Sequence, residues 1–371
     1  MITSHYIVPN KIQKILKLIL FLYQMKRYIY VLHEYGAPSH YNGLTYLAKL
    51  HNYEILFYEF KLLTLLKKVV KGNFPMKKWI ADLGFLFMLP FIKPSKIVLG
   101  IAPFNASLPI LMILLKRHEV YYHTSYTHWD GVTIGYPTKS KFVKNKWKQF
   151  TNKYVRHIFA VSQKTKEELI LNNYSTAEQI SIVNHSYNIT LSAQNKDTKE
   201  NSFIFVGRIT PQKGIKELLK LFSACPQAKL TIVGDGPDVD LVKDYSTRYK
   251  NIEYKGYIKC IQDLIPLYQS SSFIVMNSQR LDGWEELFGI SLIEGMSCGC
   301  VPITTDHSGP KEIITNKVNG IICKEGDIAK GIEQAINMKN EEYLSMRYNS
   351  IKRGNDYTIE KIALKWNEIL S

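Results

Sequence analysis

The sequence predicts an α/β protein of two domains, each with a parallel sheet, and three observations lead to this class. The chain has 371 residues, more than one hydrophobic core usually serves, so two domains of roughly 150 to 200 residues are expected. Strand-like and helix-like segments alternate along the chain, which is the pattern of parallel α/β units. A polar stretch at 193–202, AQNKDTKENS, separates two series of strands.

Each half of the chain contains a series of candidate strands. They lie at 27–35, 53–60, 96–102, 119–125, 157–162 and 180–184 in the first half, and at 203–208, 229–236, 252–258, 272–278, 301–305 and 319–323 in the second. Both series predict a Rossmann-like domain. The expected boundaries are 25–188 for the first domain, 189–200 for a linker, 201–345 for the second domain and 346–371 for a closing helix.

The formal net charge of +16 is confined to the first half. Residues 1–200 carry 27 Lys and Arg against 11 Asp and Glu, whereas residues 201–371 carry 21 of each kind. The lysines at 11–27 and 60–96 stand among Leu, Ile, Phe and Trp, which is typical of segments at a membrane surface. We therefore expect an anionic membrane surface as a partner, and no nucleic acid.

Other features bear on location. The apolar run 97–115 is interrupted by Pro103, Asn105, Ser107 and Pro109, which favours a strand, a loop and a buried helix over a membrane span. Residues 1–24 are interpreted either as an appended amphipathic helix or as a mis-assigned start before Met25. Five cysteines without C-x-x-C spacing indicate reduced core residues. The expected location is cytoplasmic, at the inner face of the cell membrane.

The stretch FIFVGRITPQKG at 203–214 is a strand-like run that stops at Gly207 and is followed by Arg208 and Lys213. If the strand ends at the carboxyl edge of the sheet, both cations reach the crevice where ligands of such sheets bind. An arginine fork and a mobile lysine charge suit a diphosphate. The alternative is two solvated surface cations.

The stretch KLTIVGDGPDVDLV at 229–242 predicts a strand, a glycine-rich turn and a helix. Its glycines permit close backbone approach to a nucleotide, although glycine and proline are also ordinary turn residues. Asp238 and Asp240 are interpreted as favourable charge in the first turn of the helix and not as metal ligands.

The stretch EELFGISLIEGMSCG at 285–299 predicts a short helix from about 290 to 298. The backbone N–H groups near Phe288, Gly289 and Ile290 would then be free to bind a phosphate. Glu286 precedes the helix and Glu294 lies one turn inside it, and a carboxylate can accept two hydroxyl hydrogen bonds from a sugar or ribose diol. Alternatively, Glu286 only favours the helix dipole and Glu294 is a solvated surface residue.

In order and separation, these segments together with YKGYI and NGIICKEGD resemble the donor-binding half of the retaining glycosyltransferases of family 4, whose E-x7-E motif corresponds to Glu286 and Glu294. Residues 157–188 resemble the end of that family's first domain, and the resemblance covers roughly residues 155–330. It implies the GT-B fold, in which two Rossmann-like domains face each other across a cleft.

The resemblance also implies roles for individual residues. Arg208 and Lys213 would bind the donor diphosphate without a metal ion or other cofactor. Glu286 would hold the transferred sugar, and Glu294 would hold the ribose. The phosphate would be bound by the backbone of Phe288, Gly289 and Ile290. Further donor contacts are expected at Gly207, and at Gly256, Tyr257 and Ile258 beside the nucleobase. His123 is expected beside the sugar. Gly36 is expected near the phosphate, although the family's usual Gly-Gly pair is absent there.

The sequence thus predicts an enzyme that moves a sugar from a nucleotide-diphosphate donor to a hydroxyl of a lipid-linked or cell-surface glycan, with retention at the anomeric carbon. Polysaccharide or lipopolysaccharide biosynthesis is the expected setting. Two alternatives remain: a GT-B-type sugar-nucleotide epimerase, and a catalytically silent membrane-associated partner of another transferase. The donor nucleobase is not predicted.

Overall fold

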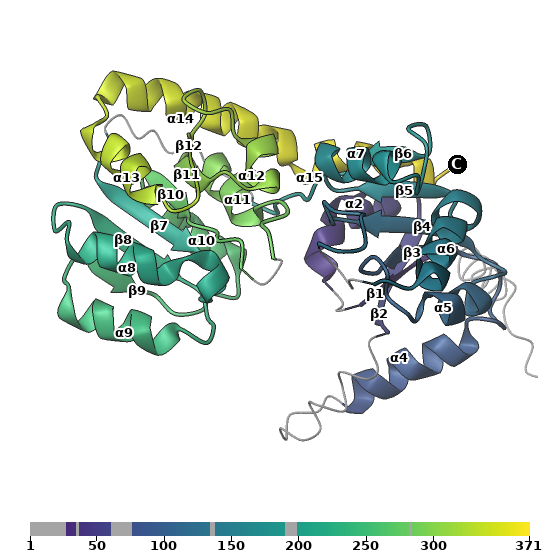
Figure 1. Cartoon of the computed structure of the whole chain (residues 1–371). Helices are drawn as coiled ribbons and strands as arrows, with labels where there is room; N and C mark the ends of the chain where they lie inside the picture. The colour runs from purple at the N-terminus through teal and green to yellow at the C-terminus, as the bar shows by residue number, and fades with distance from the viewer. Residues whose placement is uncertain (1–26, 35–36, 61–75, 134–137, 190–198, 282–283) are drawn as a thin grey trace, which may run out of the picture.

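The computed structural model describes residues 27–34, 37–60, 76–133, 138–189, 199–281 and 284–371. Within these ranges each half of the chain forms a six-stranded sheet, and Figure 1 shows the two sheets in separate lobes. The predicted α/β class with two Rossmann-like domains is confirmed. The extension expected at 1–24 and the phosphate contact expected at Gly36 lie outside the described residues.

The first sheet has the strand order β2-β1-β3-β4-β5-β6, and all neighbouring pairs are parallel. Its strands are β1 (Arg27–His33), β2 (Tyr53–Glu59), β3 (Lys96–Gly100), β4 (Glu119–Thr124), β5 (His157–Ala160) and β6 (Ile180–Ile182). Parallel strands place their carboxyl ends at one edge, so the ends of β1 and β4 bring His33 and His123 to the same side of the domain.

The second sheet has the order β12-β11-β10-β7-β8-β9, again with parallel pairs. It consists of β7 (Ser202–Val206), β8 (Lys229–Val233), β9 (Ile252–Tyr254), β10 (Phe273–Met276), β11 (Val301–Thr305) and β12 (Ile321–Cys323). Each strand coincides with a candidate strand of the sequence, because buried runs of Val, Ile and Phe are distinctive for parallel sheets.

Helices cover both faces of the first sheet. One face packs on α2 (Asn42–Leu50), whose Leu44 and Leu47 are buried against Ile29 and Val31 of β1. The other face is covered by α4 (Met76–Met88), α5 (Leu108–Leu114) and α6 (Lys141–Gln149), which share one buried cluster with β3 and β4. α7 (Gln163–Leu171) follows β5, and a short π-helical turn, Phe150–Tyr154, follows α6.

Helices also pack on the sheet of the second domain. In α8 (Ile215–Ser223), Ile215, Leu218, Leu219 and Phe222 recur at helical spacing, and all four are buried against the sheet. The remaining helices are α9 (Val239–Arg248), α10 (Ile261–Ser270), α11 (Ile290–Ser297), α12 (Ser308–Ile313), α13 (Ile328–Asn337) and α14 (Asn340–Gly354). Asp238 and Asp240 lie at the start of α9, as the sequence predicts.

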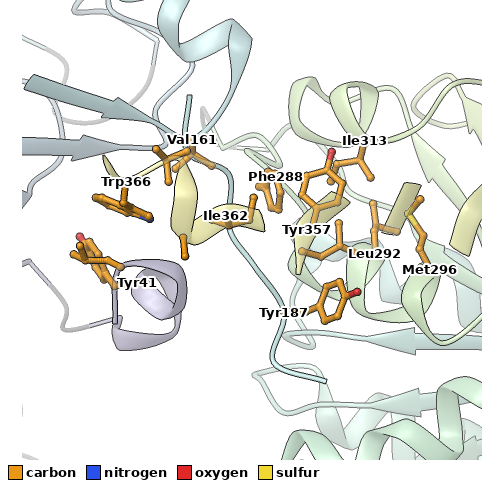
Figure 2. Close-up of a cluster of buried hydrophobic side chains, with 14 of the residues drawn as sticks. Tyr41, Val161, Tyr187, Phe288, Leu292, Met296, Ile313, Tyr357, Ile362 and Trp366 are labelled. Carbon is orange, nitrogen blue, oxygen red and sulfur yellow. The ribbon is translucent and has the colours of Figure 1, made fainter. Parts of the chain in front are cut away.

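The end of the chain returns to the first domain. After α14 the backbone passes beside the outgoing connection, where the Tyr187 N–H donates to the Tyr357 carbonyl at 3.2 Å. α15 (Ile359–Leu364) then packs on α2, and the buried Trp366 ring lies beside Tyr41 and Phe159. Figure 2 shows the resulting apolar cluster, which runs without a break from Trp366 to Phe288 and Met296 in the second domain.

Candidate active site

Three loops at the carboxyl edge of the second sheet are tied together by their backbones. The Gly207 N–H donates to the Val233 carbonyl at 3.1 Å, and the Gly234 N–H donates to the Gly256 carbonyl at 2.9 Å. Gly234 has φ +149°, and a Cβ there would lie 1.8 Å from the Gly207 oxygen. The glycine of this loop is therefore required by the crossing of two backbones, a reason that its sequence alone does not reveal.

The loop after β7 carries both predicted cations. Arg208 is exposed, and no partner for its guanidinium exists in the described part of the chain. Lys213 ends a short 3-10 turn before α8, where its ammonium forms an ion pair with Glu286 and lies 5.0 Å from the centre of the Trp284 ring. The side chains of Lys213 and Glu286 are only 13% and 12% exposed, so this pair is largely shielded from water.

Glu286 is held from several sides. The Ser278 hydroxyl donates to its carboxylate at 3.2 Å, and its own N–H donates to Nδ1 of His307 at 3.0 Å. His307 is fully buried, and its Nε2 lies 2.9 Å from the Ser278 carbonyl. These partners require Nδ1 to accept and Nε2 to donate, which fixes one neutral tautomer. Burial lowers the pKa of His307, in agreement with that state.

The helix predicted at 290–298 is α11, Ile290–Ser297. Its N-cap is Gly289 at φ +110°, a conformation that favours glycine. The backbone N–H groups of Phe288, Gly289 and Ile290 find no acceptor among the described residues. They lie two to four positions after Glu286 in sequence and carry the positive end of the helix dipole, so this is a place where an anion binds favourably.

Glu294, one turn inside α11, points toward α10. The Tyr268 hydroxyl donates to its carboxylate at 3.0 Å. Burial raises the pKa of Glu294 to about 7, although the Tyr268 hydrogen bond acts in the opposite direction. A largely buried carboxyl whose pKa is raised by burial is not the solvated surface residue of the alternative interpretation. Nearby, Gly256 adopts φ +75°, Tyr257 is exposed and Ile258 packs against the core cluster.

The first domain contributes a group of histidines at its carboxyl edge. His33, His40, His123 and His185 come from four separate segments, and adjacent rings in this group have centres 4.3 to 6.2 Å apart. Nε2 of His123 and Nδ1 of His185 are buried without a partner in the described structure. Burial holds the pKa of both rings well below the usual value, so both are neutral. The His185 ring also meets the Phe288 ring of the second domain at 5.2 Å.

Glu285 joins the two domains through contacts that the sequence did not suggest. Its carboxylate accepts from the Ser308 N–H at 3.0 Å and hydroxyl at 2.6 Å, and Oε2 lies 3.1 Å from Nε2 of His128. Arg280 lies within 3.4 Å of the same carboxylate. The E-x7-E pattern singled out only the second of two adjacent glutamates, because nothing in the sequence indicates that the loop after β4 folds over residue 285.

A second carboxylate also crosses between the domains. Glu312 of α12 accepts from the backbone N–H groups of Gln163 and Lys164, both at 2.8 Å. These N–H groups open α7 of the first domain, where Ser162 provides the N-cap. A carboxylate in this position interacts favourably with the helix dipole as well as with the two donors. Trp129, the neighbour of His128 in sequence, is buried in the core of the first domain.

Two further findings concern the described residues as a whole. No group of three or more His, Cys, Asp or Glu that could hold a metal ion exists within the described ranges. None of the helices described there is long and apolar enough to cross a bilayer. The site thus combines two cations, free backbone N–H groups and two carboxylates, a set suited to a phosphorylated sugar derivative.

Part of the chain, mostly in the second domain, matches a known family model. Residues 188–353 match the family model of glycosyl transferases group 1. This group 1 segment contains Arg208, Lys213, Glu286 and Glu294 together with all of α11.

Comparisons with individual proteins agree with this match. An uncharacterized glycosyltransferase of Haemophilus influenzae is 32% identical over 208 residues, which are 53% of this chain and 56% of that protein. An uncharacterized glycosyltransferase of Methanocaldococcus jannaschii is 25% identical over 354 residues, covering 82% of this chain and 83% of that one. The group 1 family and both relatives are glycosyltransferases, the enzyme class that the sequence predicts.

A solved structure shows the same architecture over nearly the whole chain. Anabaena HepE in complex with UDP superposes with a TM-score of 0.68 at 18% identity, covering 93% of this chain and 99% of that one. At this identity the likeness concerns the fold alone. It confirms the GT-B fold that the sequence predicts.

Proposed function

We propose that this chain is a retaining glycosyltransferase that moves a sugar from a nucleoside diphosphate donor to a hydroxyl of a glycan acceptor. The observation that carries the proposal is the Lys213–Glu286 pair within the group 1 segment. Glu286 lies just before the free N–H groups that open α11. Arg208 adds an exposed cation at the edge of the same sheet. A diphosphate has the negative charge and the acceptor oxygens that would serve as partners for Arg208 and for these N–H groups.

Donor binding would reorganise this pair. The phosphates would take the ammonium of Lys213, the guanidinium of Arg208 and the N–H groups of Phe288 to Ile290 as partners. Glu286 would then be released to accept hydrogen bonds from sugar hydroxyls, while Ser278 keeps its carboxylate in position and His307 keeps its backbone in position. Glu294, in its ionised form, would accept from the ribose hydroxyls. No metal ion or other cofactor is needed, because the two cations offset the charge of the leaving diphosphate.

Retention at the anomeric carbon follows from the resemblance to family 4. The bond from the anomeric carbon to the phosphate oxygen breaks, and a bond to the acceptor oxygen forms on the same face of the ring. The acceptor proton passes to the departing phosphate oxygen, so no protein base is required. Arg208 and Lys213 favour this step because negative charge on the phosphate increases as the bond breaks.

We further propose that the acceptor is lipid-linked or part of a cell-surface glycan and is met at the inner face of the membrane. The support is the basic excess of residues 1–200, whose lysines stand among large apolar residues. The first domain would then present the acceptor, and the group 1 segment would present the donor.

A thermal-shift screen with UDP, GDP and ADP tests the donor proposal. UDP is the first probe because Anabaena HepE was solved in complex with UDP. A nucleotide at about 100 times its dissociation constant should stabilise the fold by about 2.7 kcal/mol. Arg208→Ala should reduce that shift, whereas Lys352→Ala, an exposed cation on α14, should not. If all three nucleotides left the unfolding temperature unchanged, the proposal would be wrong.

The epimerase alternative is favoured by one observation, the four histidines gathered at the edge of the first domain. An epimerase needs acid–base groups and converts the donor without an acceptor. Incubating the protein with UDP-sugar alone separates the two functions: a transferase leaves the sugar configuration unchanged. If Glu286→Ala had no effect on sugar transfer to an added acceptor, the assignment of Glu286 to the site would be wrong. If the wild-type protein transferred no sugar at all, the silent-partner alternative would be favoured.

A further inference from the structure

Three helices form the outer layer of the first domain. α4, α5 and α6 pack on the sheet through Phe85, Leu89, Leu111 and Trp147, which lie in one buried cluster. Their opposite sides carry large apolar side chains that are 57 to 76% exposed. We call these side chains the outer apolar surface: Ile80, Phe87, Phe91, Ile110, Ile113 and Phe142.

The residues of this surface belong to neighbouring elements. Arg117, just after α5, donates to the Pro90 carbonyl at 2.9 Å, and Nε2 of His118 lies 2.8 Å from the Leu89 carbonyl. These contacts fix the end of α5 beside the end of α4, and α6 contacts α5 in turn. Figure 1 shows α4 along the lower edge of the lobe with α5 and α6 next to it. Phe91 and Ile113 therefore lie on adjacent segments.

Spacing places the apolar residues in stripes. Ile80 and Phe87 are seven positions apart, which is close to two helical turns, and Ile110 and Ile113 are three apart on α5. The sequence led us to expect a buried helix within 97–115. The structure instead buries Leu108 and Leu111 and leaves Ile110 and Ile113 in solvent. Exposure of this many large apolar side chains in one layer is unusual for a surface that faces only water.

Positive charge predominates around the outer apolar surface, although Glu119, two positions after Arg117, is 45% exposed and pairs with Lys96. The single carboxylate within the bounds of α4, α5 and α6 is Asp82, which is buried and accepts from the Glu59 N–H at 3.2 Å. The helix α6 contains four lysines, and three exposed cations follow α4 and α5: Lys93, Lys116 and Arg117. An anionic partner would therefore meet attraction and almost no repulsion over this whole layer.

We propose that the outer apolar surface with its surrounding lysines docks the first domain onto an anionic lipid bilayer. Lipid is the partner whose chemistry matches both features, since acyl chains accept Phe and Ile while phosphate headgroups accept Lys and Arg. A nucleic acid would use the cations but would leave the aliphatic side chains in water. This inference specifies the membrane partner of the proposed function, and its failure would leave the donor-site proposal intact.

Vesicle flotation tests the inference with the full chain. Wild type should float with vesicles that contain phosphatidylglycerol, and binding should fall steeply with added salt. The combined variant Phe87→Ser, Phe91→Ser, Ile113→Ser should lose at least about tenfold in vesicle affinity, because its apolar contacts are removed. Leu171→Ser and Leu364→Ser change apolar residues that are 74 and 65% exposed outside the surface, and should bind as wild type does.

Charge-reversal variants provide an independent test of the inference. Lys93→Glu with Lys116→Glu should also lose at least about tenfold in affinity for anionic vesicles. The matched control, Lys216→Glu with Lys352→Glu, changes exposed lysines of the second domain and should bind normally. All variants should keep the wild-type unfolding temperature and the UDP-induced shift, which monitors the donor site separately.

Three results would overturn the inference. The first is unchanged vesicle binding by the triple Ser variant. The second is binding to a single-stranded RNA probe but not to vesicles, which would assign the surface to nucleic acid. The third is vesicle binding that disappears when residues 1–24 are removed and is insensitive to every change in the outer apolar surface.

Discussion

The imidazole of His128 and the carboxylate of Glu285 meet across the two domains, with Nε2 and Oε2 3.1 Å apart although 157 positions separate the residues. Burial acts to raise the pKa of Glu285, but hydrogen bonds from Ser308 and His128 outweigh it and lower the pKa to about 2. Glu285 directly precedes Glu286, the residue that pairs with Lys213 in the candidate site. The contact between the domains and the geometry of the site are thereby linked through one peptide bond.

Glu285→Gln should lower the free energy of unfolding by roughly 1–3 kcal/mol at pH 7, because it removes a buried charge that Ser308, His128 and Arg280 all contact. A folded-state pKa below the ordinary 4.5 means that the stabilisation is present above pH 4.5 and is lost as the pH falls toward 2. Urea unfolding from pH 8 to pH 3.5 measures this contribution to the free energy of unfolding. The difference between wild type and variant should be constant down to about pH 5 and shrink below pH 4.5.

Glu253→Gln is the matched control, because Glu253 pairs with Lys229 and Lys255 at the surface of the second domain alone. It should change stability by no more than about 0.5 kcal/mol. Equal effects of the two substitutions would mean that the contact between the domains adds nothing.

Glu294→Gln should change how stability depends on pH in the opposite sense. Because burial raises the pKa of Glu294 to about 7, the stability linked to its protonated form is complete below pH 4.5 and is lost as the pH rises through 7. Wild type should therefore lose on the order of 1–3 kcal/mol relative to the variant between pH 4.5 and pH 8. Parallel unfolding curves for both proteins over that range would contradict the assignment.

Tyr268→Phe offers a second measurement of the same group. The Tyr268 hydroxyl lowers the pKa of Glu294 by donating to its carboxylate. Its removal should move the pH-dependent loss of stability to higher pH. UDP affinity should shift in the same direction if ionised Glu294 holds the ribose.

Arg208→Ala and Lys213→Ala should each lower kcat/KM for sugar transfer by at least about 100-fold, since each removes a cation from the leaving diphosphate. Arg208 is exposed, so its substitution should leave the unfolding temperature unchanged and isolate the chemical effect. Steady-state kinetics with a UDP-sugar and an added acceptor measure the loss. Lys216→Ala, on the exposed side of α8, is the control. Transfer at the wild-type rate by Arg208→Ala would exclude that residue from the site.

Trp366→Ala should destabilise the first domain by about 3–5 kcal/mol. The Trp366 ring is buried against Tyr41, His123 and Phe159, all of which belong to the first domain. Leu364→Ala, two positions earlier and 65% exposed, should have little effect. Denaturant unfolding followed by tryptophan fluorescence and circular dichroism compares the two. A small effect of Trp366→Ala would mean that the returning segment is not part of the domain core.

The local sequence pattern was sufficient to predict the strands of the fold and the helix that opens the candidate site. Buried apolar runs predicted every strand of both sheets, and the helix at 290–298 was placed within one residue of α11. It also identified the chain positions of Lys213 and Glu286, although nothing in the sequence shows that these residues form an ion pair. His307 and Ser278 were missed because they act on Glu286 through hydrogen bonds across loops, and such contacts leave no periodic signal.

The sequence by itself determined the strand order along the chain, the basic character of the first half and the residues that an anion-binding site would use. These properties depend on short-range periodicity and composition, which a single chain displays directly. Only the tertiary structure shows that Glu285 contacts His128 and that Trp366 packs beside Tyr41. It also shows that Ile110 and Ile113 are exposed. Contacts between distant segments depend on how the two sheets and their helices pack, and packing is a property of the folded whole.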